Sequence, residues 1–298
     1  HDGREDARSF TETVQVGQRL EALAEITAVK REKQAAIVHD WQNKWALEGS
    51  CGPRNAGMGY WDELKRHYNA LARDGIAVEF VDQNADLTDY GLVVVPMLYL
   101  LTDAFAKKLC AFAQNGGTVI VTYWSGVVDE SDLCRLGDTP YGLTELLGLR
   151  RTEIDGMYDG ETRRCMSAAG CTLPAAQAST LCEVAALDEE NPAEPLSLYD
   201  EDYFAGHPAV AVHRYGKGRA YYLASRFDEA FYRAFYHNAA KEIGLSPAWP
   251  EALPEGVLAV RRGSFVFVQN CTDQPVTVGN TVLDRYRTAV WKDMDRIF

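Results

Sequence analysis

Four short apolar segments, each bounded by polar or turn residues, predict the strands of a buried sheet. They lie at residues 35–38, 76–81, 92–96 and 118–123. The third segment is apolar over its first four positions, which is typical of a strand covered on both faces. Amphipathic helical segments follow the first and third of these strands. This β-α-β-α-β alternation predicts an α/β fold with a doubly wound parallel sheet.

Apolar stripes and end signals predict the helices. A capping box at Ser9 and Glu12 predicts the start of the first one. Its apolar stripe comprises Phe10, Val14, Gly17, Leu20 and Leu23. A second helix is predicted to carry on one buried face Trp61, Leu64, Tyr68 and Leu71. Gly75 follows it as a C-cap glycine. Thr102 and Asp228 are the predicted N-caps of two later helices.

The pattern weakens after the fourth strand. Residues 150–178 show little periodicity and many small or polar side chains, which predicts loops and short strands. Residues 196–199 are expected to form an edge strand. Residues 209–214 and 219–224 form a predicted hairpin around the turn Tyr215-Gly-Lys-Gly218.

Prolines divide the end of the chain. Pro247, Pro250 and Pro254 lie within ten residues, and they predict a linker. Alternating short strands after this linker predict a small antiparallel β domain, which is marginal as an independent fold. We expect four segments: a connecting helix at 1–30, an α/β domain at 31–245, a linker at 246–255 and a β domain at 256–298.

Composition narrows the range of partners. The 298 residues carry a net charge of −13, and such a surface repels nucleic-acid phosphates. No apolar segment approaches the roughly 18 residues of a membrane span, and no signal peptide is recognisable. The seven cysteines have irregular spacing, which indicates free thiols in a cytoplasmic protein. We therefore expect neither a nucleic-acid nor a membrane partner.

Catalytic motifs are missing from the positions where this fold class would carry them. A nucleophile elbow of the GxSxG type requires glycine at position 123, which is Tyr123, so Ser125 is interpreted as a turn residue. The six histidines form no HxH or HExxH pattern. There is no P-loop and no GxGxxG. The residues therefore predict no catalytic group, no metal and no cofactor.

One stretch near the N-terminus carries large aromatic and ionisable residues directly after the first strand. In open α/β sheets, ligands and partners meet the carboxyl ends of the strands. Trp124 occupies the corresponding position after the fourth strand. We therefore expect an interface or substrate rim formed by His39, Asp40, Trp41, Trp45, Glu48 and Trp124. The alternatives are that the tryptophans fill the core or stack on sugar rings.

Several segments together resemble glycoside hydrolase family 42 β-galactosidases. The opening His1-x-Gly-Arg4 resembles the segment that leaves the catalytic barrel in that family. The strand Ala36-Ile-Val-His-Asp40 followed by Trp41-x-x-x-Trp-Ala-Leu-Glu48 resembles its second domain, as does Gly116-Gly-Thr-Val-Ile-Val-Thr-Tyr123. Leu253-Pro-x-Gly-Val257 is similar to its C-terminal β domain. The resemblance covers nearly the whole chain and preserves the order of the motifs.

The resemblance implies a flavodoxin-like, class I glutamine amidotransferase-like domain that assembles a homotrimer. It also implies an N-terminal (β/α)8 barrel that carries both catalytic glutamates and hydrolyses terminal β-D-galactosides with retention. These 298 residues contain no counterpart of that barrel, so we expect a non-catalytic region that is inactive alone. Its expected partners are other copies and its own barrel, which His39, Asp40, Trp41, Trp45 and Glu48 would face.

The two alternative functions are a stand-alone amidotransferase-like hydrolase and a galactoside-binding accessory module. A stand-alone amidotransferase-like hydrolase would need the elbow cysteine, which the turn from Tyr123 to Gly126 lacks. It would also need a His-x-Glu pair, which Ser225-Arg-Phe-Asp228 does not offer. A galactoside-binding accessory module would use Trp41, Trp45 or Trp124 as stacking platforms.

Overall fold

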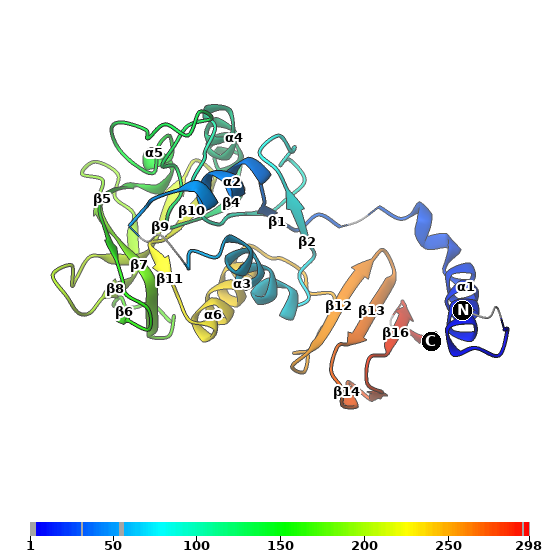
Figure 1. Cartoon of the computed structure of the whole chain (residues 1–298). Coiled ribbons are helices and arrows are strands. Elements are labelled where there is room, and N and C mark those ends of the chain that lie inside the picture. The colour runs from blue at the N-terminus through cyan, green and yellow to red at the C-terminus, as the bar shows by residue number, and fades with distance from the viewer. Residues whose placement is uncertain (1–3, 31, 54–56, 294, 298) are drawn as a thin grey trace. The chain divides into compact units, whose positions relative to one another are not determined.

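The apolar segments found in the sequence form neighbouring strands of one large sheet (Figure 1). The computed structural model describes residues 4–30, 32–53, 57–293 and 295–297. The parallel half of the sheet consists of β1 (Ala35–Val38), β2 (Val78–Val81), β3 (Leu92–Val95), β4 (Thr118–Thr122) and β10 (Gly218–Leu223). Their order is β2-β1-β3-β4-β10, and each neighbouring pair is parallel. The predicted parallel α/β arrangement is therefore confirmed for this half.

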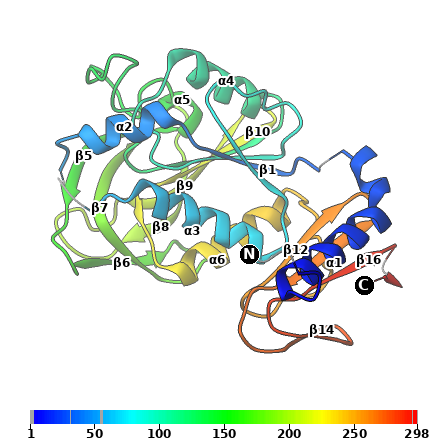
Figure 2. The same cartoon turned by 45° about the vertical axis from the view of Figure 1, so that its right-hand side comes forward.

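Helices cover both faces of the parallel half. α3 (Tyr60–Arg73) and α6 (Glu229–Glu242) lie on one face, and α4 (Asp103–Gln114) and α5 (Thr144–Leu147) lie on the other (Figures 1 and 2). The predicted caps are confirmed, because the side chains of Thr102 and Asp228 each accept a backbone hydrogen bond from the third residue after them. Gly75, just after α3, has the expected positive φ of 67°.

The prediction of a doubly wound parallel sheet is only partly correct, because the large sheet is mixed. An antiparallel half extends the sheet to 11 strands in the order β11-β7-β6-β8-β9-β10, with β5 also paired to β7. These strands are β5 (Leu149–Gly156), β6 (Thr162–Ser167), β7 (Ala176–Leu187), β8 (Glu194–Tyr199), β9 (Pro208–Tyr215) and β11 (Ser225–Arg226). The predicted hairpin is confirmed as β9 and β10, with Gly216 at φ 58°.

The antiparallel half was missed because its hydrophobic signal is weak. Residues 150–178 were expected to be loops and short strands, yet they belong largely to β5, β6 and the start of the 12-residue β7. β8 is not an edge strand, since it lies between β6 and β9. Alanine, serine and threonine supply much of β7, and one face of β6 is largely exposed. Long-range strand pairing, rather than local propensity, therefore decides this region.

Residues Lys33–Leu253 form one compact unit, the α/β unit. Residues His1–Glu32 and Pro254–Phe298 together form a second, the β unit. Its sheet contains β12 (Val257–Arg262), β13 (Phe265–Asn270), β16 (Thr288–Lys292) and β17 (Asp295–Arg296), with β14 (Val276–Val278) and β15 (Thr281–Leu283) as a separate hairpin. Every strand pair in it is antiparallel, as predicted.

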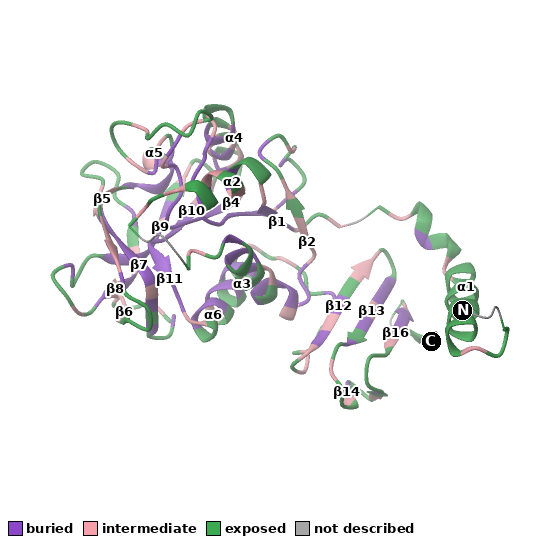
Figure 3. Cartoon of the chain, in the orientation of Figure 1, coloured by how far each residue is buried: buried purple, intermediate pink, exposed green. Residues whose placement is uncertain are grey.

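Within the β unit, the N-terminal segment contributes to the core. α1 (Arg8–Ala22) leads into the 3-10 helix η1 (Ala24–Ala28), whose Ile26 packs with Phe265 and Val290. The apolar stripe of α1 itself is exposed (Figure 3). The predicted capping box is wrong, because α1 begins at Arg8 and places Ser9 inside the helix, with no side-chain cap bond.

A buried carboxylate joins α3, α6 and the sheet. Glu63 accepts hydrogen bonds from Arg226 Nε at 2.8 Å and from the Tyr232 hydroxyl at 2.9 Å, and His67 Nε2 lies 3.3 Å away. Arg226 Nε also donates to the Tyr123 hydroxyl at 3.1 Å. Burial by itself raises the pKa of Glu63, but His67, Arg226 and Tyr232 outweigh burial and lower it to about 2.

This carboxylate should stabilise the fold in a pH-dependent way. Glu63→Gln leaves the buried Arg226 without its counter-charge, so we expect the free energy of unfolding to fall by about 3 kcal/mol at pH 7. The folded-state pKa lies below the ordinary 4.5, so the stabilisation is present above pH 4.5 and is lost as the pH falls towards 2. Urea denaturation of both proteins should show their difference shrinking across that range. Glu48→Gln, at an exposed i,i+4 ion pair, serves as control and should cost less than about 1 kcal/mol.

Candidate interaction surface

α2 (Trp41–Gly49) begins directly after β1 and was not predicted as a helix. Asp40 ends the strand and caps the helix, because its Oδ1 accepts hydrogen bonds from Gln42 N at 2.8 Å and Asn43 N at 3.1 Å. β1 is completely buried, so the first turn of α2 is held at the carboxyl edge of the parallel strands. Residues 35–49 therefore form a strand, a helix cap and a helix.

The exposed side of this region carries three clustered tryptophans. Trp41 is 53% exposed, Trp45 is 62% exposed and Trp61, at the start of α3, is 42% exposed. The ring centroid of Trp41 lies 6.3 Å from that of Trp45 and 5.9 Å from that of Trp61. These three residues are called the tryptophan surface below. Large exposed aromatic clusters are uncommon on monomers and are typical of binding sites.

Two ionisable residues predicted for the interface, His39 and Glu48, lie near the tryptophan surface. The His39 ring packs against two indoles, with centroids 4.6 Å from Trp61 and 5.1 Å from Trp41. Burial lowers the pKa of His39. Glu48 is exposed and accepts from Lys44 Nζ at 2.5 Å, and Lys44 Nζ also lies 5.9 Å from the Trp41 ring.

A buried amide anchors α2 from below. Asn43 is fully buried, and its Nδ2 donates to Met97 O at 3.0 Å while its Oδ1 accepts from Leu100 N at 2.9 Å. Gln83 donates to both Asp40 Oδ2 and Leu100 O, at 3.3 and 3.2 Å. Asn43 therefore fills the space between the carboxyl ends of β1 and β3, where sheets of this strand order commonly bind ligands.

Trp124 does not belong to the tryptophan surface. It is only 5% exposed, its ring stacks on Tyr99 with centroids 5.5 Å apart, and its φ is 58°. Its backbone N–H donates to Glu183 Oε1 at 3.0 Å, and Glu183 also binds Arg151 at 2.7 Å and the Tyr222 hydroxyl. The suggestion that Trp124 stacks on a sugar is not favoured, because its faces are covered.

The turn after β4 is not arranged for nucleophilic catalysis. Ser125 is fully buried, and its Oγ accepts a hydrogen bond from Leu98 N at 3.0 Å. The Nδ1 atoms of His207 and His213 lie 3.2 and 2.9 Å from the carbonyl oxygens of Ala185 and Leu146. Each of these side chains therefore has a structural partner on the backbone, as expected for a turn serine and structural histidines.

Two further kinds of feature, a metal site and a membrane-spanning helix, are absent from the described part of the chain. Its histidine, cysteine, aspartate and glutamate side chains form no group of three that could hold a metal ion. Within the same residues, no helix is both long and apolar enough to cross a membrane. Asn270-Cys271-Thr272 matches the glycosylation pattern, but the Asn270 side chain is fully buried and its Nδ2 donates to backbone carbonyls, including that of Gln274 at 2.7 Å.

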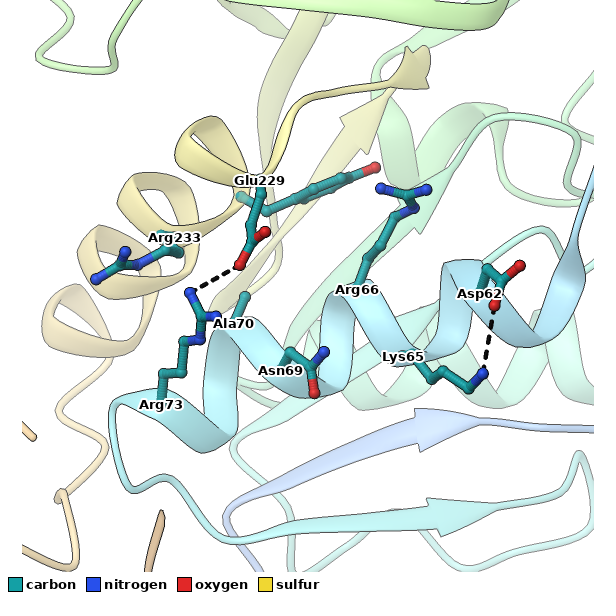
Figure 4. A pocket seen from close by; sticks show the side chains of 9 residues that line it. Asp62, Lys65, Arg66, Asn69, Ala70, Arg73, Glu229 and Arg233 are labelled. Carbon is teal, nitrogen blue, oxygen red and sulfur yellow. Dashed lines mark hydrogen bonds and ion pairs between the residues drawn. The ribbon is translucent and has the colours of Figure 1, made fainter. Parts of the chain in front are cut away.

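A basic groove runs between α3 and α6 next to the tryptophan surface (Figure 4). Its cavity volume is about 250 Å³. The residues that line it are Asp62, Lys65, Arg66, Asn69, Ala70, Arg73, Glu229, Tyr232 and Arg233. Lys65 pairs with Asp62 at 3.3 Å and Arg73 pairs with Glu229 at 2.7 Å. Four basic and two acidic side chains leave this groove positive on a chain that is strongly negative overall.

Sequence reasoning missed some residues and misplaced another. Trp61 was predicted on the buried face of its helix, but the buried stripe of α3 comprises Tyr60, Glu63, Leu64, His67, Ala70, Leu71 and Ala72. The 60-64-67-71 spacing could have identified this face. Asn43 and Glu183 carried no signal, since a buried polar residue is recognised only through partners that are distant in sequence.

These features define an α/β domain that presents an aromatic surface and contains no assembled catalytic group among the residues described. A family model described as the β-galactosidase trimerisation domain matches residues 33–246. The chain therefore belongs to the GH42 β-galactosidase family, and this region is its trimerisation domain.

Full-length relatives agree with this assignment. The chain is 42% identical over 281 residues to the β-galactosidase BglY of Alicyclobacillus acidocaldarius and 34% identical over 291 residues to Pbg of Clostridium perfringens. It resembles the crystal structure of a cold-adapted β-galactosidase from Rahnella sp. R3, with a TM-score of 0.89 and 37% identity over 97% of this chain. The match covers 92% and 95% of this chain for the two sequence relatives. The matched region spans only 40% of BglY, 42% of Pbg and 45% of the Rahnella protein.

Exposed and buried tryptophans should respond differently to truncation. Trp45→Ala removes few internal contacts, so we expect the free energy of unfolding to change by no more than about 0.5 kcal/mol. Trp124→Ala opens a cavity against Tyr99 and should cost about 3–5 kcal/mol. Urea denaturation under conditions where the chain is monomeric measures both. An equal loss for the two variants would assign Trp45 to the core.

Proposed function

We propose that this chain is the assembly region of a β-galactosidase that hydrolyses terminal β-D-galactosides with retention. Chemistry takes place in a catalytic barrel that these residues do not contain, and this region holds the subunits together as a homotrimer. The observation that carries the proposal is the tryptophan surface inside the matched trimerisation domain. The seven unpaired cysteines support a cytoplasmic location.

The physical argument is that the tryptophan surface is both apolar and rigid. Tryptophan is enriched at the energetically dominant positions of interfaces. Asn43 and Asp40 hold α2 in place, and His39 packs against two of the rings, so little conformational freedom remains to be lost on binding. We infer that a neighbouring subunit or the catalytic barrel covers His39, Trp41, Trp45 and Glu48. Asp40 acts from beneath as the cap of α2.

We also assign the parallel half to the flavodoxin-like class. The order β2-β1-β3-β4-β10, parallel throughout, supports this, because 2-1-3-4-5 is the flavodoxin-like order. The amidotransferase-like label rests on the same order of elements. Trp124 stands in the turn after β4, with φ of 58°, and Ser125, at the elbow-serine position of the GxSxG comparison, is fully buried. An indole and a buried hydroxyl in this turn support a role without chemistry for this domain.

The purified 298-residue chain should not hydrolyse nitrophenyl β-galactoside. A retaining glycosidase needs two carboxylates about 5 Å apart around the sugar. The buried carboxylates of this chain, Glu63 and Glu183, are instead bound to arginines. The assay should compare the wild-type chain with Glu63→Gln and Glu183→Gln. Turnover that depends on either glutamate would refute the proposal that catalysis takes place in a separate barrel.

Assembly should depend on the tryptophan surface. Trp45→Ala should raise the dissociation constant of the oligomer at least about thirtyfold, as for an interface hot spot, while leaving the unfolding of the monomer unchanged. Sedimentation velocity over a wide concentration range measures the association. Tyr158→Ala, which truncates another highly exposed aromatic residue, is the matched control and should assemble like the wild type. Unchanged assembly of the Trp45 variant would place the subunit contact elsewhere.

A further inference from the structure

A ring of three identical subunits needs two different contact surfaces on each subunit. In a two-fold dimer one surface meets itself, but in a three-fold ring each copy binds head to tail. This inference therefore rests on the proposed homotrimer. The tryptophan surface and the basic groove supply one of the two surfaces, and another exposed apolar segment of the α/β unit is a candidate for the second.

Residues 129–138, here called the leucine loop, have the features of the second surface. Leu133 is 65% exposed and Leu136 is 90% exposed. The loop follows β4 and is joined to the rest of the carboxyl edge through a bridge from Val128 to Leu100. Single exposed leucines are ordinary. Two of them on one short, firmly held loop are less so, and they offer apolar side chains that could enter a neighbour's surface.

The leucine loop is held in one conformation by a dense set of contacts. Asp129 Oδ1 accepts hydrogen bonds from Ser131 N at 2.8 Å and Leu133 N at 3.1 Å. Arg135 pairs with Asp103 at 2.8 Å, and its guanidinium lies 4.3 Å from the centre of the Tyr141 ring. Such a loop loses little conformational entropy when it binds.

Charge identifies what this loop would bind. It contains the four acidic residues Asp129, Glu130, Asp132 and Asp138 and only one basic residue, Arg135. The basic groove has four basic side chains. Arg66 pairs with the buried Glu63 at 3.7 Å and Arg73 with Glu229 at 2.7 Å, whereas Lys65 has only an exposed pair with Asp62 at 3.3 Å, which an incoming carboxylate can replace. Arg233 has no ion-pair partner within the described part of the chain, so it is available to an incoming carboxylate.

The groove and the tryptophan surface share one face of α3. Trp61 belongs to the tryptophan surface, and Lys65, four residues further along the helix, lines the groove. Lys65 and Arg66 lie one turn further along the same helix, and α6 contributes Glu229, Tyr232 and Arg233 to the other side of the lining (Figure 4). The combined surface is apolar at the tryptophans and basic at the groove. A loop that carries both leucines and carboxylates is complementary to it in apolar character and in charge.

We propose that the leucine loop of one copy docks onto the tryptophan surface and basic groove of the next copy. Leu133 and Leu136 pack on the indoles, and the carboxylates of the loop meet Lys65 and Arg233. Each copy donates one loop and receives another, which closes the ring after three copies. In this contact, the partner of the tryptophan surface is a second copy of this chain.

The first test removes the apolar part of the contact. Leu133→Asp combined with Leu136→Asp should raise the dissociation constant of the trimer at least about thirtyfold in sedimentation velocity. Both side chains are exposed, so circular dichroism and the midpoint of thermal unfolding should stay unchanged. Tyr158→Asp places the same new charge at another exposed position, and it should leave the trimer intact.

The second test is a charge exchange. Lys65→Glu with Arg233→Glu should dissociate the trimer at 50 mM salt, as should Glu130→Lys with Asp138→Lys. The chain that carries all four substitutions should recover the trimer, because every loop and every groove then has the opposite sign. The control is Lys107→Glu with Lys217→Glu, which reverses two basic residues outside the groove and should not be rescued by the loop substitutions.

The outcomes separate this inference from the proposed function. A wild-type chain that is monomeric at all concentrations overturns both. A wild-type trimer that loses assembly with Trp45→Ala but keeps it with the leucine and loop-charge variants overturns only the loop contact, and assigns the tryptophan surface to another occupant. Loss of assembly with both leucines changed, together with recovery in the fourfold charge variant, supports the contact.

Discussion

The buried carboxylate of Glu63 is the interaction on which the rest of the structure depends. It lies inside α3, and its partners Arg226 and Tyr232 come from β11 and α6. A charge at this depth is tolerated only because a guanidinium and a hydroxyl are bonded to it. The carboxylate thus holds α3 and α6 together, and every outward-facing residue of the basic groove stands on one of these two helices. The position of Trp61 at the start of α3 depends on the same contact.

A second buried carboxylate joins the two halves of the sheet. Glu183 in β7 binds Arg151 in β5, the Tyr222 hydroxyl in β10 and the backbone of Trp124 after β4. In α/β enzymes, the turn at this position presents reactive groups. Here Trp124 occupies the strained position with its ring buried, and Asn43 fills the neighbouring space between β1 and β3. At these two points the carboxyl edge of the sheet is therefore occupied by the protein's own side chains, and the exposed tryptophans lie on the outer surface.

The outer surface is consequently rigid as well as apolar. Trp41 and Trp45 stand on a helix whose first turn is capped by Asp40 and whose inner side is anchored by Asn43. The leucine loop is fixed in a comparable way by Asp129 and Arg135. Surfaces prepared in this manner give up little entropy on association, which suits a permanent oligomer better than a site that must open and close.

The sequence by itself determined β1, β3 and β4, because these strands are short apolar segments that are buried on both faces, and it located the cap residues Thr102 and Asp228. The family motifs identified the class of protein. Tertiary structure alone decided the antiparallel half, since β7 consists largely of small residues whose pairing is long-range. It alone decided which tryptophans are exposed. Trp41, Trp45 and Trp124 carry the same side chain after equivalent strands, and packing against Tyr99 and Gly52 helps to bury the third.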